Sequence, residues 1–240
     1  MKLNVQSLDL EYNGGKLYVS DQEHKPDIRT LEQMKDLLFD IDYASKQDKH
    51  TPLYHMYRDI VPELKKDGYR YDITILSPTP LGNEFNKTFG HYHPTAVENL
   101  SYTELYNVLH GEAHYLLQKP ANDWRLEEVV LLKAKKGDCI PMPPNYGHIT
   151  INPGKEPLIM ANLVSPDFSS EYREYQTKKG GAYYELVNGK TIPNPLYEAL
   201  PELKMKKGGC KAAFKPDILA AFYKDPKPFE FLKDPRLYKD

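Results

Sequence analysis

Between Tyr69 and Val187 the sequence is a succession of short apolar runs separated by residues that break regular structure. Glycine, proline and asparagine stand between the runs, as at Gly111, Gly137 and the Pro143-Pro144 pair. No helical segments alternate with the runs, which disfavours a doubly wound parallel sheet. The pattern predicts a mainly β chain folded as an antiparallel jelly-roll barrel or sandwich with a few flanking helices. Eight runs have the length and residue types of strands: Tyr69–Leu76, Glu104–Leu109, Glu112–Gln118, Glu127–Leu132, Asp138–Met142, His148–Asn152, Leu158–Val164 and Tyr183–Val187.

The residues before this region predict a hairpin and a helix. Asn13-Gly14-Gly15 separates Leu8–Tyr12 from Leu17–Ser20 and readily takes the positive φ angles of a tight turn. Thr30 can cap a helix over Leu31–Ile41, with Gln33 as its capping-box partner. We expect residues 1–49 to pack on a barrel formed by residues 50–190.

The residues after the barrel predict a loop-rich extension, 191–240. Pro193, Pro195 and Pro201 are followed by a basic run from Lys204 to Lys211, which is most simply a solvated turn. A short helix is expected from Pro216 to Tyr223, with its apolar side against the barrel or a second subunit.

Composition narrows the possible partners. Of 240 residues, 32 are basic and 34 acidic, so the net charge of −2 provides no basic field for nucleic acid. The first twenty residues lack the apolar core of a signal peptide, and no run reaches membrane-spanning length. Cys139 and Cys210 are too few and too far apart in sequence to predict a disulfide framework. We therefore expect a cytoplasmic protein with no nucleic-acid or membrane partner.

One histidine pair is the starting point for a predicted metal site. His91 and His93 stand two positions apart on an extended segment, so both imidazoles point to one face. Glu104 and His148 would complete a set of three nitrogen ligands and one oxygen ligand for a divalent transition metal. Because eleven positions separate His93 from Glu104, Glu98 is a rival ligand, but it stands in a polar, turn-like stretch, whereas Glu104 begins a strand-like run. A loop insertion over Ala96–Tyr102 would explain this spacing.

A second block has its own regular spacing. It begins at Gly137, turns at Pro143-Pro144, and continues through His148 to Asn152. With the His-x-His block, it resembles the two motifs of the cupin superfamily, in which paired hairpins hold one metal through three histidines and a glutamate. Within the cupins, the chain is similar to the cupin-type glucose-6-phosphate isomerases, on the strength of Gly-His-Tyr-His-Pro, Thr-Glu-Leu-Tyr, Gly-Glu-Ala-His-Tyr-Leu-Leu-Gln and Pro-Pro-Asn-Tyr-Gly-His, over roughly residues 54–189.

This resemblance implies an enzyme of glycolysis and gluconeogenesis that interconverts glucose 6-phosphate and fructose 6-phosphate. The metal would be Fe first, with Mn, Zn, Ni or Co also able to occupy such a site. Glu104 would be both ligand and catalytic base, and the enzyme would be a homodimer. Where the family pattern has an aromatic residue and a histidine, this chain has Val164 and Ser170. The substrate would be bound by Tyr54, Thr74, Thr88, the backbone of Gly90, and Tyr106.

Two other functions fit the same ligand set. A cupin dioxygenase can hold iron with three histidines and a carboxylate. A non-catalytic cupin could bind a sugar or a metal without turnover, although the chain shows no helix-turn-helix segment that would make it the sensor of a regulator.

Overall fold

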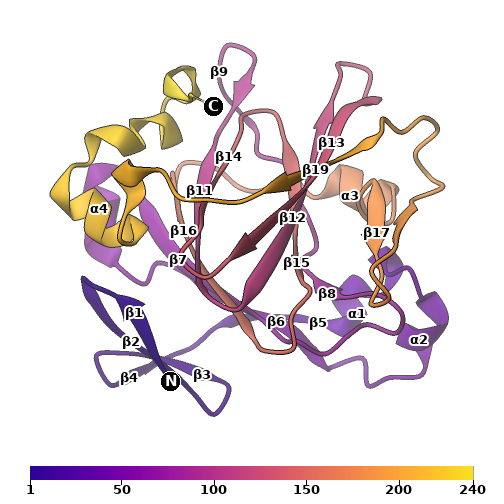
Figure 1. Ribbon diagram of the computed structural model, residues 1–240, viewed down its shortest axis with the longest axis horizontal. Helices are drawn as coiled ribbons and strands as arrows, with labels where there is room; N and C mark the ends of the chain where they lie inside the picture. The colour runs from indigo at the N-terminus through magenta and orange to yellow at the C-terminus, as the bar shows by residue number, and fades with distance from the viewer. Residues whose placement is uncertain (240) are drawn as a thin grey trace.

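Two β-sheets face each other and form the body of the protein (Figure 1). The computed structural model describes residues 1–239. The six-stranded sheet has the order β14-β11-β16-β7-β6-β5, and the five-stranded sheet has the order β19-β13-β12-β15-β8. The first sheet consists of Cys139–Met142 (β14), Glu104–His110 (β11), Leu158–Val164 (β16), Arg70–Leu76 (β7), Pro52–Tyr57 (β6) and Asp27–Thr30 (β5). The second consists of Leu203–Lys207 (β19), Leu126–Lys135 (β13), Glu112–Pro120 (β12), Gly147–Asn152 (β15) and Asn86–Lys87 (β8).

Seven of the eight predicted strands lie in these sheets. The eighth, β17 (Tyr183–Glu185), pairs with β18 (Thr191–Pro193) in a separate two-stranded sheet. Neighbouring strands in the two main sheets are antiparallel, except β13 and β19, which are parallel. The expectation of a mainly β jelly roll of the cupin type is confirmed.

The space between the sheets is filled by side chains that alternate along each strand. Tyr106 on β11 and Tyr115 on β12 place their ring centroids 5.4 Å apart across the two sheets. The hydroxyl of Tyr115 lies 3.6 Å from the sulfur of Met160 on β16. This interior core closes the barrel below the histidine pair.

A second apolar layer covers the outer face of the six-stranded sheet. Outward-facing residues such as Ile73 and Leu163 are buried against Leu10 near the N-terminus and Phe222 near the C-terminus. In Figure 1 the indigo N-terminal strands and the yellow C-terminal helices accordingly lie on one side of the barrel. The N-terminal sheet has strands Lys2–Val5 (β1), Leu8–Asn13 (β2), Lys16–Val19 (β3) and Gln22–His24 (β4), of which β2 and β3 form the expected hairpin. The helices of this layer are the 3-10 segment Pro62–Asp67, and, near the C-terminus, Ala212–Phe214 (3-10), Ile218–Lys224 (α4), Lys227–Leu232 (3-10) and Pro235–Leu237 (3-10).

The prediction of one continuous helix over Leu31–Ile41 is wrong. The chain forms α1 (Leu31–Met34), a 3-10 turn (Lys35–Leu37) and, after a break, α2 (Ile41–Ser45). The backbone is extended at Leu38, where the adjacent Leu37 and Leu38 are both buried. Asp40 then caps α2 by accepting a hydrogen bond from the Tyr43 N–H.

The C-terminal extension has more regular structure than expected. β19 adds in parallel to β13, although the basic run was expected to be a turn. This pairing places Gly209 beside β14, where its carbonyl accepts a hydrogen bond from the Cys139 N–H at 2.9 Å. Cys139 and Cys210 are consequently joined in a disulfide, with their Cα atoms 4.5 Å apart. The long separation of the two cysteines in sequence therefore did not rule out a disulfide between them, because the parallel pairing that brings them together depends on tertiary structure.

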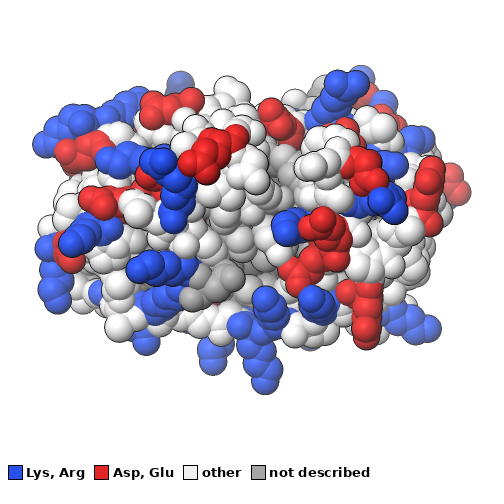
Figure 2. All heavy atoms as spheres, turned by 90° about the horizontal axis from the view of Figure 1, so that it is seen from above, with Lys and Arg blue, Asp and Glu red and all other residues white. Residues whose placement is uncertain are grey.

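Three short elements remain. They are β9 (Thr95–Val97), β10 (Leu100–Ser101) and α3 (Arg173–Thr177). Of the helices in residues 1–239, none combines the length and apolar character needed to cross a membrane. Figure 2 shows basic and acidic side chains interspersed over the face seen from above.

Candidate metal centre and active site

Three histidines and one glutamate converge at one end of the barrel. His91 and His93 lie on the extended segment between β8 and β9, Glu104 begins β11, and His148 is on β15. Backbone bonds between His91 and His148 join the two histidine segments, since each N–H donates to the other's carbonyl. One nitrogen or oxygen atom from each of the four side chains lies within 4.8 Å of those of the other three.

The distances between these atoms fit a shared ion. Nε2 of His91 and Nε2 of His93 are 3.1 Å apart. Oε2 of Glu104 lies 3.4 Å from Nε2 of His93 and 3.3 Å from Nε2 of His148. Ligands bound about 2.1 Å from one metal at right angles are about 3.0 Å apart. The four side chains thus have the spacing of a coordination shell for a divalent metal.

The electrostatics of the site also fit a bound metal ion. Oε2 of Glu104 is buried and has no hydrogen-bond partner of good geometry among residues 1–239, as expected of an atom that binds a cation. Burial lowers the pKa of His91 far below its usual range, with His148 and His93 adding to the effect. Burial also lowers the pKa of His148, against the opposing charge of Glu104. Both imidazoles are therefore neutral near pH 7, which is the form that binds metals.

Glu104 stays ionised in this setting. Burial raises the pKa of its carboxyl, but His148 and His93 outweigh burial and hold that pKa well below its usual range. A carbonyl also positions one ligand, since Nδ1 of His93 lies 3.0 Å from the Tyr102 oxygen. Such a contact orients the ring so that Nε2 faces the metal position.

The structure distinguishes Glu104 from its rival. Glu98 lies at the turn between β9 and β10, with its side chain 66% exposed and 3.8 Å from Arg236. The side chain of Glu104 is 6% exposed and adjoins the histidines. The long spacing after His93 is explained by the β9–β10 hairpin, which fills the predicted insertion.

A narrow cavity leads from the histidines to the surface. Its volume is about 60 Å³, below the roughly 300 Å³ at which ligand pockets usually begin. A ligand of that size would require side chains at the mouth to move. The walls include all five residues predicted to bind substrate: Tyr54, Thr74, Thr88, Gly90 and Tyr106.

Two arginines in this wall were missed by the sequence analysis. Arg58 and Arg70 line the cavity, and both pair with the fully buried Asp72. The Arg58–Asp72 distance is 2.8 Å, and the Arg70–Asp72 distance is 2.9 Å. Strand alternation could have found them, because Arg58 stands four positions after Tyr54 and Arg70 four before Thr74.

Comparison with known proteins identifies the family. The family model described as glucose-6-phosphate isomerase (GPI) matches residues 32–202. The chain belongs to the glucose-6-phosphate isomerase family. Glucose-6-phosphate isomerase of Thermococcus litoralis is 30% identical over 169 residues, which cover 70% of this chain and 84% of the relative. The enzyme of Pyrococcus furiosus is 28% identical over 178 residues, 72% of this chain and 89% of that one. Among solved structures, an oxalate decarboxylase from Lactobacillus farciminis covers 49% of this chain and 30% of its own, at 20% identity and a TM-score of 0.38, too small an overlap to bear on function.

The glucose-6-phosphate isomerase match contains every residue proposed for the site, from Tyr54 to His148. It stops before β19, so the strand that extends the five-stranded sheet lies beyond the matched part. Residues 1–31, which contain the N-terminal sheet and β5, also lie outside it.

Aromatic side chains lie near the two positions at which the resemblance predicts a departure from the family pattern. Val164 and Ser170 both line the cavity. Phe168, which lies between them in sequence, places its ring centroid 4.5 Å from that of His93 and stacks on Tyr102 at 4.6 Å. Tyr172 meets Phe89 edge to face at 5.2 Å.

Proposed function

We propose that this chain interconverts glucose 6-phosphate and fructose 6-phosphate at the barrel mouth, as the members of its family are named for doing. The observation that carries the proposal is the group formed by His91, His93, Glu104 and His148 inside the matched segment. A decisive test is conversion of fructose 6-phosphate by the purified protein, with the product identified by NMR. Absence of glucose 6-phosphate at any metal loading would contradict the proposal.

The four residues of this group are the proposed metal ligands. A bound divalent ion would supply Lewis acidity toward the sugar's first two oxygens. Iron is our first choice, with Mn, Zn, Ni and Co as the other candidates, because a nitrogen and oxygen set accepts all of them. Elemental analysis of the protein as purified would show which of them it carries.

Glu104 is the proposed catalytic residue. The isomerisation moves one hydrogen between C1 and C2 while the carbonyl shifts the other way. An ionised Glu104 can remove a proton next to the carbonyl and return it to the neighbouring carbon, while the hydroxyl proton of the first carbon passes to the former carbonyl oxygen. The low pKa of its carboxyl keeps the base charged at neutral pH.

A direct hydride shift is the alternative route, in which Glu104 only orients the metal and substrate. The two routes differ in the fate of the transferred hydrogen. Deuterium from solvent enters the product if Glu104 exchanges its proton, whereas complete retention of a label at C2 counts against a freely exchanging base. Product analysis in D₂O therefore detects a freely exchanging base and excludes one when no deuterium enters.

The substrate phosphate is proposed to bind at the wall that carries Thr74, Thr88 and Gly90. Thr88 stands three positions before His91 and Gly90 directly before it, and Gly90 has φ +84°, which favours glycine. A Cβ at Gly90 would also lie 2.6 Å from Ile149. The hydroxyl of Tyr54 accepts a hydrogen bond from the Phe89 N–H at 3.2 Å and fixes this segment. Tyr106 is proposed to line the sugar site.

Arg58 and Arg70 add positive charge at the mouth. Together with Asp72 they carry one net positive charge, which favours entry of a phosphorylated sugar over a neutral one. The pKa of the Arg58 guanidinium is raised: burial opposes its charge, but Asp72 outweighs burial, and Glu104 adds to the effect. The negative charge of Glu104 therefore also stabilises the charged form of Arg58.

The family match favours isomerisation over the two other functions considered from the sequence. A dioxygenase would consume oxygen, and a non-catalytic sugar-binding cupin would bind metal or sugar without turnover. Recording oxygen uptake beside sugar conversion separates all three.

We further propose a homodimer located in the cytoplasm. Light scattering tests the dimer. The Cys139–Cys210 disulfide argues against a cytoplasmic location, because disulfides are rare in cytosolic proteins outside hyperthermophiles. Thiol titration of protein isolated from its native cells would test the cytoplasmic assignment.

A further inference from the structure

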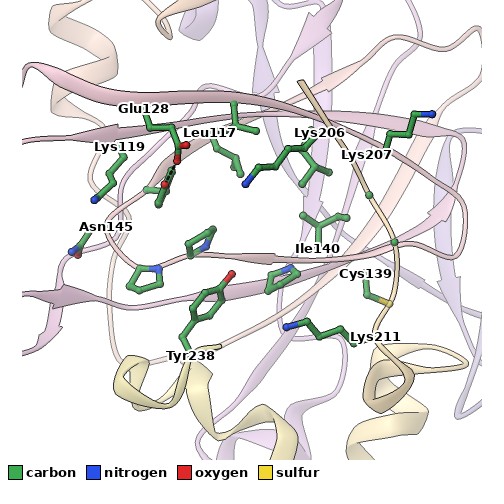
Figure 3. A pocket seen from close by; sticks show the side chains of 18 of the residues that line it. Leu117, Lys119, Glu128, Cys139, Ile140, Asn145, Lys206, Lys207, Lys211 and Tyr238 are labelled. Carbon is green, nitrogen blue, oxygen red and sulfur yellow. Dashed lines mark hydrogen bonds between the residues drawn. The ribbon is translucent and has the colours of Figure 1, made fainter. Parts of the chain in front are cut away.

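A second and larger cavity lies where the edges of the two sheets meet. Its volume is about 1020 Å³, and it lies between β19 and β13 on one side and β14 on the other (Figure 3). Ligand cavities in proteins commonly fall between about 300 and 1000 Å³. None of the metal-site residues lines it.

The inner wall of this seam cavity is apolar. Leu117 on β12, Val130 and Leu132 on β13, and Ile140 on β14 form it. Pro141, Pro143 and Pro144 extend the apolar surface toward the mouth. Leu117, Val130 and Ile140 are themselves buried, so an apolar body would remove from water chiefly the partly exposed Leu132 and the three prolines.

The mouth of the seam cavity is basic. In the parallel pairing of β19 with β13, Lys206 lies opposite Leu132. The two side chains therefore point to the same face of the sheet, toward the cavity. Figure 3 shows Lys206 and Lys211 directed into the cavity, whereas Lys207 points away from it. Because side chains alternate along β19, the side chain of Lys206 points into the cavity and that of Lys207 does not.

The one acidic residue in this wall is already engaged. Glu128 pairs through one carboxylate oxygen with Lys204 at 2.6 Å and accepts a hydrogen bond from Tyr146 with the other. Within residues 1–239 no carboxylate forms an ion pair with Lys206 or Lys211, and Nζ of Lys211 donates to the Lys239 carbonyl. Among the described residues, the seam cavity therefore has an apolar floor and two lysines without a direct carboxylate partner, with Glu128 close enough to Lys206 for their charges to attract.

The basic wall belongs to the part of the chain outside the family match. Gly208 N–H donates to the Lys133 carbonyl at 2.6 Å, and the Cys139–Cys210 disulfide fixes the next turn. The segment lies so close to the barrel that a Cβ on Gly208 would come within 2.9 Å of Ile140. Because residues after 202 are not part of the match, the family activity does not account for this wall.

We propose that the seam cavity is a binding site for a small organic anion with an apolar body. The anionic head contacts Lys206 and Lys211, and the body lies on Leu132 and on Pro141, Pro143 and Pro144. Lysine ammonium groups bind phosphate, sulfonate and carboxylate heads as point charges. The inference is independent of the isomerase proposal, because the two cavities share no lining residue.

A fluorescent probe of this chemistry tests the site. 8-Anilinonaphthalene-1-sulfonate has an aromatic body and one anionic head, and N-phenyl-1-naphthylamine is its neutral analogue. In titrations of the metal-loaded full chain, the sulfonate should bind saturably. Its affinity should be higher than that of the neutral probe. An excess of fructose 6-phosphate should leave this binding unchanged. Displacement by the sugar phosphate, or equal affinity for both probes, would overturn the proposal.

Two lysine variants locate the binding. Lys206→Ala should weaken sulfonate binding about tenfold and leave the neutral probe unaffected. Lys207→Ala makes the same change of charge one residue away and should leave both probes unaffected. Equal effects of the two variants would mean that the probe responds only to general surface charge and would overturn the assignment. Unchanged far-UV circular dichroism and isomerase activity would show that both variants remain folded.

Discussion

Oε2 of Glu104 lies 3.3 Å from Nε2 of His148, and this contact joins the two sheets of the barrel, because β11 and β15 belong to different sheets. The proposed metal centre is therefore held by the packing of one sheet on the other. Changes in its ligands should affect chemistry more than fold, since the interior core lies below them.

Glu104→Gln should reduce kcat by at least about a hundredfold, in the range found for loss of general acid–base catalysis. The amide keeps the shape of the side chain but removes the charge that binds metal and accepts a proton. Steady-state kinetics and metal content measured on one preparation would show the loss. Glu98→Gln, at an exposed position, is the matched control and should behave like the wild type. A fully active Glu104→Gln enzyme would remove Glu104 from the mechanism.

Arg58→Met should raise the KM for fructose 6-phosphate several-fold, with a smaller effect on kcat. Methionine keeps an unbranched side chain but removes the charge at the cavity mouth, and Asp72 retains Arg70 as a partner. The KM increase should shrink at high ionic strength, where salt already screens the attraction. Arg125→Met, on an exposed turn, is the control. An unchanged KM would exclude Arg58 from substrate capture.

Cys210→Ser should lower the free energy of unfolding by up to about 4 kcal/mol, because the disulfide closes a long loop, with a sequence separation of 71. Denaturant titrations with and without dithiothreitol measure the effect. The reductant should destabilise the wild type and leave Cys210→Ser unchanged. If reduction leaves the wild type equally stable, the disulfide does not contribute to its stability.

Alkaline pH should destabilise the protein through its buried tyrosines. Burial raises the pKa of Tyr69 to about 12, with smaller contributions from Glu230 and Asp67. An unfolded tyrosine ionises near pH 10, so the stabilising contribution is complete below pH 10 and is lost as the pH rises to 12. Tyr69→Phe should therefore lose stability less steeply between pH 10 and 12 in urea titrations. Identical slopes for both proteins would show that Tyr69 ionises freely.

Local pattern predicted the strands well, and it singled out four residues that the structure brings together at one end of the barrel. Alternation and turn residues define β7, β11, β12 and β16 within a residue or two, because each strand is bounded by a glycine, a proline or a polar turn. The His91-x-His93 pair, Glu104 and His148 come together because the two sheets face each other, with Glu104 on one sheet and His148 on the other.

Features that depend on tertiary contacts were not predicted. The helix after Thr30 breaks at Leu38 because two adjacent leucines must both be buried, which propensity alone does not reveal. The Cys139–Cys210 disulfide depends on the parallel addition of β19, and the arginine pair depends on a shared Asp72. Arg58 was missed because β6 was not recognised as a strand, so its alternation from Tyr54 was never applied.

The most direct test of the metal-dependent isomerase is a coupled assay that converts fructose 6-phosphate to glucose 6-phosphate. The protein is assayed as purified, after EDTA and dialysis, and after addition of single divalent metals. We expect activity to disappear with the metal and to return with at least one of them, iron first, while His148→Ala stays inactive under every condition. Full activity in protein shown by elemental analysis to be metal-free would contradict the proposed role of the three histidines and Glu104.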